Sequence, residues 1–150
     1  MNEIPSAPGT YILLGFINEE SDFQVGKLGV VRLGVGRYVY CGSALGPGGL
    51  KARIQRHLKK EKKHFWHIDY LSQLFAIQET WLRIGMQRLE CQICRTLQRH
   101  FLCQNPVSGF GSTDCRAGCK SHFLSIPNHV SVSVLDLFLD KFNFDRISIC

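Results

Sequence analysis

The pattern of hydrophobic and polar positions predicts strands in the first third of the chain. Thr10–Phe16 is a β-branched, aliphatic and aromatic run, and a polar stretch separates it from a second extended run, Phe23–Leu33. Gly26 and Gly29 interrupt that second run. We expect the two runs to pair as a hairpin. Arg37–Cys41 is predicted as the next strand.

The middle of the chain changes from strand to helix at a loop, residues 42–49, that contains four glycines and a proline. After this loop, apolar residues recur every four positions, which is the spacing of the buried stripe of a helix. They are Leu50, Ile54 and Leu58. A shorter helix over 66–73 and a strand over 75–84 follow in the prediction.

A second long helix is predicted over 85–103, and it carries an acidic residue on its apolar side. The apolar stripe consists of Met86, Leu89, Ile93, Leu97 and Phe101. Glu90 lies inside this stripe, where an ionised carboxylate is costly unless it meets a cation. One interpretation is a structural ion pair with an arginine, which the helix alone favours because buried acids are more often paired than catalytic. The other is a metal ligand that points into a cleft.

The last part of the chain is predicted to be a connector followed by a closing helix. Residues 104–125 are rich in glycine and read as loop, and apolar periodicity predicts the helix at about 131–143. Since no repeat or linker divides the sequence, we expect residues 1–150 to form a single domain with a core of about 8–125. The expected fold class is α+β, a sandwich-like arrangement with a small mixed or antiparallel central sheet of three or more strands flanked by helices.

Composition narrows the class of protein. Hydrophobic residues make up 45% of the 150 residues and charged residues 20%, which is ordinary globular usage and excludes a disordered or fibrous chain. No apolar run approaches the roughly 20 residues that cross a bilayer, and the first residues do not resemble a signal peptide. We therefore expect a cytoplasmic, intracellular protein without a membrane partner.

Positive charge is concentrated in one segment. The net charge is +6, and residues 51–63 contain seven basic side chains beside a single acid, Glu61. The basic residues are Lys51, Arg53, Arg56, Lys59, Lys60, Lys62 and Lys63. A nucleic acid is one partner that such a cluster selects, because each neutralised phosphate releases counterions. A solvated helix face is the alternative, and charge alone does not decide between them.

The chain has seven cysteines, an odd number, which indicates thiols or metal ligands rather than a disulfide framework. Five residues have spacing that permits a zinc site built from four of them. They are Cys91, Cys94, Cys115, Cys119 and His122. Ordinary buried or free thiols are the favoured interpretation, because cysteine pairs three apart on a helix are common by chance.

Two short motifs resemble a known superfamily. Gly9-Thr10-Tyr11 and Tyr40-Cys41-Gly42, followed by a helix with Arg53 and His57 and a later helix with Glu90, are similar to the GIY-YIG nucleases. Further segments resemble its DUF123 branch, which in some prokaryotes is fused to endonuclease III-like glycosylases. These segments are Tyr38–Gly46, Gly49–Arg53, Trp66–Leu71 and Gly109–Cys115.

The resemblance implies a GIY-YIG-like domain that cuts phosphodiesters with one divalent metal, Mg²⁺ or Mn²⁺. It implies that Tyr11 is the general base or aligns the water, and that Tyr40 lines the same wall. Arg53 would hold the scissile phosphate, and His57 would assist proton transfer. Glu90 would bind the metal. Because a tyrosine is a poor base in water, we expect a nearby cation to lower the pKa of Tyr11.

The sequence therefore predicts a metal-dependent endonuclease that hydrolyses DNA, in repair or processing. Its nucleic-acid contacts are expected from Lys51, Arg56, Lys59, Lys60, Lys62 and Lys63. A nucleotide cofactor is not expected, because the loop 42–49 lacks the Gly-Lys-Ser/Thr ending of a P-loop. The alternatives are a nucleic-acid-binding module without catalysis and a zinc-stabilised structural or partner-binding domain.

Overall fold

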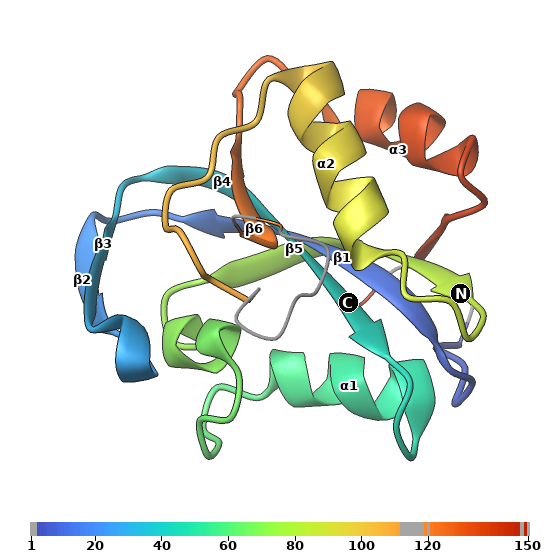
Figure 1. Cartoon of the computed structure of the whole chain (residues 1–150), viewed down its shortest axis with the longest axis horizontal. Helices are drawn as coiled ribbons and strands as arrows, with labels where there is room; N and C mark the ends of the chain where they lie inside the picture. Colours follow the sequence, from blue (N-terminus) through green and yellow to red (C-terminus); the bar gives the residue numbers. More distant parts are fainter. Residues whose placement is uncertain (1–2, 112–118, 120, 148, 150) are drawn as a thin grey trace.

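A central antiparallel sheet lies between two layers of helices in the computed structural model of the protein (Figure 1). The structure describes residues 3–111, 119, 121–147 and 149. From one edge to the other, the sheet consists of β6 (Phe123–Ile126), β4 (Gly36–Ala44), β1 (Gly9–Ile17), β5 (Ala76–Ile84) and β7 (Asp145–Ile147). The α+β fold class and the antiparallel sheet expected from the sequence are confirmed.

Side chains on β1 alternate between the two faces of the sheet, and each face has its own core. Tyr11 and Leu13 face the layer of α1 (Gly49–Leu58) and of the short 3-10 helix η2 (His67–Leu71). Ile12 and Leu14 face the opposite layer, which consists of α2 (Glu90–Phe101) and α3 (Val132–Asp140). Figure 1 shows these two helical layers on opposite sides of the strands. The sheet is therefore buried on both faces.

Two motif glycines make room for close packing around β1. Tyr11 pairs with Gly42 across the β1–β4 ladder, and a Cβ at residue 42 would collide with the Tyr11 hydroxyl oxygen. A Cβ at Gly9 would collide with the Arg83 carbonyl oxygen and with the side chain of Leu50. The glycines thus let the Tyr11 ring lie over β4 and let α1 approach β1.

The predicted hairpin between 10–16 and 23–33 is wrong. β1 pairs with β4 and β5, whereas β2 (Ser21–Gln24) and β3 (Val30–Leu33) form a separate two-stranded sheet. A 3-10 turn, η1 (Gly26–Leu28), divides the second run. Because almost every side chain of β1 is buried, this strand needs partners on both edges and a core on both faces, which one hairpin does not provide.

Other boundaries also differ from the prediction. The 85–103 helix begins only at Glu90, because Gly85 adopts φ +150° and its N–H donates to the Pro8 carbonyl oxygen at 2.9 Å. Met86 is consequently exposed and not part of a core. Leu58, the last residue of α1, is also exposed, although the sequence placed it in a buried stripe. The end of the predicted loop 104–125 is strand β6, and β7 was not predicted.

The short helix, the strand after it and the closing helix are confirmed as η2, β5 and α3. Ser131 caps α3, since its side-chain oxygen accepts a hydrogen bond from the Val134 N–H. Within the described part of the chain, no helix combines the length and the apolar character needed to cross a membrane.

Candidate active site

A cavity of about 810 Å³ lies where β1 and β4 meet the starts of α1 and α2. Its wall includes Tyr11 from β1, Tyr40 from β4, Arg53 from α1 and Glu90 from α2. These are the residues that the resemblance assigned to the site, apart from His57, which lies behind Tyr11. The fold therefore gathers side chains from four distant parts of the sequence around one hollow.

Tyr11 and His57 form a buried pair at the base of the cavity. The Tyr11 hydroxyl lies 2.7 Å from Nε2 of His57, and both side chains are almost completely buried. Burial, with Lys62 as a further cause, lowers the pKa of His57 to about 3, so the imidazole is neutral. Burial also raises the pKa of Tyr11, and the nearby Arg53 opposes this rise without overcoming it. Both groups are therefore neutral near pH 7, and one hydrogen bond joins the Tyr11 hydroxyl to Nε2 of His57.

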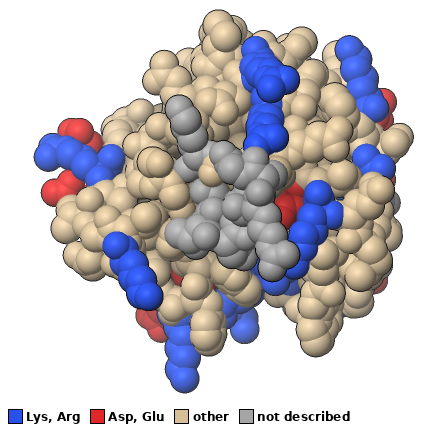
Figure 2. All heavy atoms as spheres, in the orientation of Figure 1, with Lys and Arg blue, Asp and Glu red and all other residues tan. Residues whose placement is uncertain are grey.

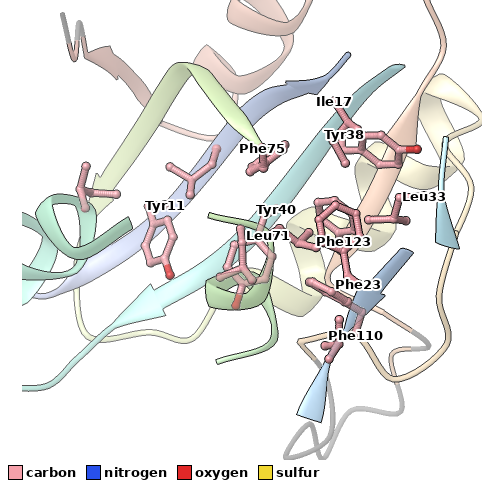
Figure 3. Close-up of a cluster of buried hydrophobic side chains, with 14 of the residues drawn as sticks. Tyr11, Ile17, Phe23, Leu33, Tyr38, Tyr40, Leu71, Phe75, Phe110 and Phe123 are labelled. Carbon is pink, nitrogen blue, oxygen red and sulfur yellow. The ribbon is translucent and has the colours of Figure 1, made fainter. Parts of the chain in front are cut away.

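The sequence predicted that a nearby cation lowers the pKa of Tyr11. Arg53 does act in that direction, but it does not decide the net shift. The net shift is upward, because the loss of water around the phenol outweighs the guanidinium. Tyr40 behaves in the same way, and burial raises its pKa well above the ordinary value. The Tyr40 and Tyr11 ring centroids are 6.4 Å apart, and Figure 3 shows both rings on the same side of the sheet.

Arg53 is held in place by two contacts. Its Nη1 donates to the Ser43 carbonyl oxygen at 3.0 Å, and its Cζ lies 4.0 Å from the centroid of the Trp66 ring. A guanidinium over an indole face is a favourable cation–π arrangement. Arg53 therefore presents fixed positive charge to the cavity.

The neighbouring arginine has a different role. Arg56 pairs with the fully buried Asp69 at 2.8 Å, and the same carboxylate oxygen accepts the backbone N–H groups of Phe65 and Trp66. Burial alone would raise the pKa of Asp69, but the Trp66 N–H, Arg56 and the Phe65 N–H outweigh it and hold the pKa below the ordinary value. This network fixes Trp66, on which Arg53 stacks.

Glu90 is the first residue of α2 and is half-buried at the cavity wall. Its carboxylate accepts a hydrogen bond from the Ser43 hydroxyl. Among the described residues, no ion pair involves Glu90. The arginine partner that the helix pattern favoured is thus not observed, because the helix starts at Glu90 and places it at the mouth of a cavity.

The donor atoms near Glu90 suit a hard cation. Mg²⁺ and Mn²⁺ prefer oxygen ligands, and Mg²⁺ usually keeps several waters while one or two carboxylates and a substrate phosphate complete its shell. A single carboxylate beside a hydroxyl, open to a hollow of this size, fits that description.

The predicted nucleic-acid contacts divide into two groups. Lys51 pairs with Glu3 at 2.9 Å, Arg56 with Asp69, and the Lys62 ammonium donates to carbonyl oxygens at the end of α1. Three lysines are exposed instead, namely Lys59, Lys60 and Lys63. On the face in Figure 2, Lys and Arg side chains lie in several separate places and not in one continuous patch.

Three of the five predicted zinc ligands come together beside the cavity. The sulfur atoms of Cys91 and Cys119 and a ring nitrogen of His122 all lie within 4.8 Å of one another. Cys94 does not join them, because it is buried and its thiol donates to the Ser121 carbonyl oxygen at 3.3 Å. Cys115 lies outside the described residues.

A family model described as "Domain of unknown function DUF123" matches residues 10–142. The chain belongs to the DUF123 family. No curated protein and no solved structure gives a significant match to it. The matched span of this DUF123 domain includes every cavity residue described above.

Three residues at the DUF123 cavity were not assigned a role from the sequence. Ser43 contacts both Arg53 and Glu90, and it directly follows the second motif, which is the signal that could have found it. Trp66 supports Arg53, and in the sequence it stood out only as part of the segment Trp66–Leu71. Arg88 also lines the cavity. It precedes α2 in a segment that was predicted to be helical, and no pattern distinguished it.

Proposed function

We propose that this DUF123 domain is a metal-dependent endonuclease that hydrolyses phosphodiester bonds in DNA. The observation that carries the proposal is the single cavity that brings together Tyr11, Tyr40, Arg53 and Glu90. A phosphodiester transition state concentrates negative charge, which a fixed guanidinium stabilises. The resemblance of the two motifs to GIY-YIG nucleases supports the same conclusion.

The buried pair offers a path for the proton of the attacking water. In this mechanism Arg53 binds the scissile phosphate, and Tyr11 Oη accepts the water proton while it passes its own proton to Nε2 of His57. The neutral imidazole is able to accept that proton. A bound phosphate adds negative charge nearby and raises the pKa of His57, which makes Nε2 a better acceptor in the complex than in the free protein.

Glu90 and Ser43 would hold the divalent cation. Bound there, Mg²⁺ or Mn²⁺ would supply positive charge for the phosphate oxygens that become more negative in the transition state. The hydrogen bond from Ser43 orients the carboxylate toward the cavity.

The exposed Lys59, Lys60 and Lys63 follow the end of α1 and would contact the DNA backbone. A role in repair or processing rests on the resemblance to the glycosylase-associated branch. A module that only binds nucleic acid explains the cavity less well, because a half-buried carboxylate beside the phosphate site weakens binding unless a cation neutralises it.

The test is cleavage of plasmid, branched DNA and single-stranded DNA in Mg²⁺ or Mn²⁺ by the wild type, Arg53→Ala and Glu90→Ala. The matched control is Arg32→Ala, since Arg32 is an exposed arginine paired with Glu20. We expect cleavage by the wild type and the control only. Equal cleavage by all four proteins would identify a contaminating nuclease and overturn the assignment, as would no cleavage by any of them.

A further inference from the structure

We propose that Cys91, Cys119 and His122 form a zinc site in the wall of the cavity, separate from the Mg²⁺ or Mn²⁺ position at Glu90. Their ligand atoms all lie within 4.8 Å of one another, although they come from α2 and from the segment that leads into β6. Two sulfurs and an imidazole nitrogen are soft or borderline ligands, which select Zn²⁺ over Mg²⁺.

The backbone holds His122 in position for a ligand. Its N–H donates to the Phe110 carbonyl oxygen at 2.9 Å, and its carbonyl oxygen accepts the Cys41 N–H at 3.0 Å. The side chain is 5% exposed, and its Nε2 lies 3.2 Å from the Cys91 sulfur. Little rearrangement is therefore needed to place a cation between these two atoms.

Cys91 is well placed to act as a thiolate. It is the second residue of α2, a helix of 12 residues, and the positive end of the helix dipole stabilises an anion there. Cys94, one turn further along the same helix, instead faces the core beside α2 and is hydrogen-bonded to a backbone carbonyl. The two cysteines thus differ in environment although they share a helix.

Within the described part of the chain three side chains supply ligand atoms, and a tetrahedral zinc site takes a fourth ligand. Cys91 and His122 both line the cavity, so a zinc ion held by them would lie in its wall. Cys91 is also the chain neighbour of Glu90. Zinc at this place would fasten the start of α2 to the segment before β6, and so hold Glu90 at the cavity wall.

Metal content of the purified domain tests the site without any cleavage assay, so its failure is distinguishable from failure of the proposed function. We expect one zinc ion per chain by elemental mass spectrometry. Replacement by Co²⁺ should give the thiolate charge-transfer absorption and the d–d bands of a tetrahedral site. Cys91→Ser, Cys119→Ser and His122→Gln should each lose the metal, and Cys94→Ala, the matched cysteine control, should keep it.

A ligand exchange keeps the test decisive if a serine variant does not fold. Cys119→His retains a zinc ligand and should bind metal with an altered Co²⁺ spectrum. Three results would overturn the proposal. They are a wild type without zinc or Co²⁺ binding, a Cys91–Cys119 disulfide found by mass spectrometry in the protein as purified, and Cys91 alkylation by iodoacetamide that added Zn²⁺ does not slow. The last result would indicate a Cys91–His122 nucleophilic pair instead.

Discussion

The Tyr11 hydroxyl lies 2.7 Å from Nε2 of His57, and burial has opposite effects on the pKa values of the two groups. The phenol keeps its proton more firmly than a solvated tyrosine, and the imidazole binds one less readily than a solvated histidine. The pair is therefore neutral on both sides near pH 7, and one hydrogen bond joins the oxygen to the nitrogen.

The first prediction concerns this hydrogen bond. Tyr11→Phe removes the hydroxyl and leaves Nε2 of His57 buried without this hydrogen-bond partner. We expect cleavage to fall by about 10²–10⁴-fold, as for the loss of a general base, while DNA binding is retained. The free energy of unfolding should fall by about 1–3 kcal/mol, measured by urea denaturation.

Tyr38→Phe is the matched control for Tyr11→Phe. The Tyr38 hydroxyl donates to the Gly34 carbonyl oxygen at 2.8 Å, and Tyr38 does not line the cavity. Cleavage by this variant should equal that of the wild type. If both variants lost activity equally, the effect would be a general one on the sheet and not one on proton transfer.

The second prediction is a pH dependence of stability. The pKa of His57 is about 3 in the folded protein, against an ordinary value of 6.5, so the unfolded chain takes up the proton first as the pH falls. The neutral imidazole makes its full contribution to the free energy of unfolding above about pH 6.5. This contribution falls as the pH is lowered, by about 2–3 kcal/mol between about pH 6.5 and about pH 4.5. Thermal melts across this interval measure the loss.

His57→Gln isolates that contribution, because the amide oxygen can still accept the Tyr11 hydrogen but does not titrate. Its melting temperature should change less with pH over the same interval. Asp69 also has a lowered pKa, but its contribution to stability is lost only as the pH falls below about 3.8, the ordinary pKa of an aspartate. Parallel curves for wild type and variant would show that His57 is solvated in the folded protein.

The third prediction separates charge from geometry at Arg53. Arg53→Lys keeps the positive charge but loses the planar fork that bonds Ser43 and stacks on Trp66. We expect kcat to fall on the order of 10²–10³-fold, with a smaller change in KM. Steady-state kinetics on an oligonucleotide measure both values. Full activity of the lysine variant would mean that only the charge matters at this position.

The fourth prediction concerns the exposed lysines. Replacing Lys59, Lys60 and Lys63 by glutamine should weaken DNA binding and flatten its salt dependence by about 0.9 in log–log slope for each lost phosphate contact. Fluorescence anisotropy at several salt concentrations measures the slope. Lys27→Gln with Lys141→Gln is the control, since both lysines are exposed elsewhere. An equal effect of the control would show that DNA responds to net charge alone.

The chemistry of the cavity was more predictable from the sequence than its surroundings. The two motifs and the spacing of Arg53 and His57 on one helix identified side chains that the structure does bring together. The role of Trp66 was not predictable, because it depends on the Asp69 network, which joins residues from two elements. A local pattern does not contain such a contact.

The errors in the fold have a common cause. Strand pairing depends on contacts between distant segments, so the sequence indicated that β1 is a strand but not that β4 and β5 are its partners. The start of α2 was missed because helical spacing continues back to Met86, whereas the conformation of Gly85 ends it. Sequence spacing alone made Cys94 a candidate zinc ligand. In the structure Cys94 lies on the core side of α2, where its thiol donates to the Ser121 carbonyl oxygen, so it does not join the cluster.

Ser43 joins the two sides of the molecule with one residue. Its carbonyl oxygen accepts a hydrogen bond from Arg53 of α1, and its hydroxyl donates one to Glu90 at the N-terminus of α2. Ser43, a residue of β4, therefore sets the separation between the positive charge of Arg53 and the negative charge of Glu90. Detachment of either layer would break this spacing, so the charge arrangement of the cavity depends on both layers being docked on the sheet.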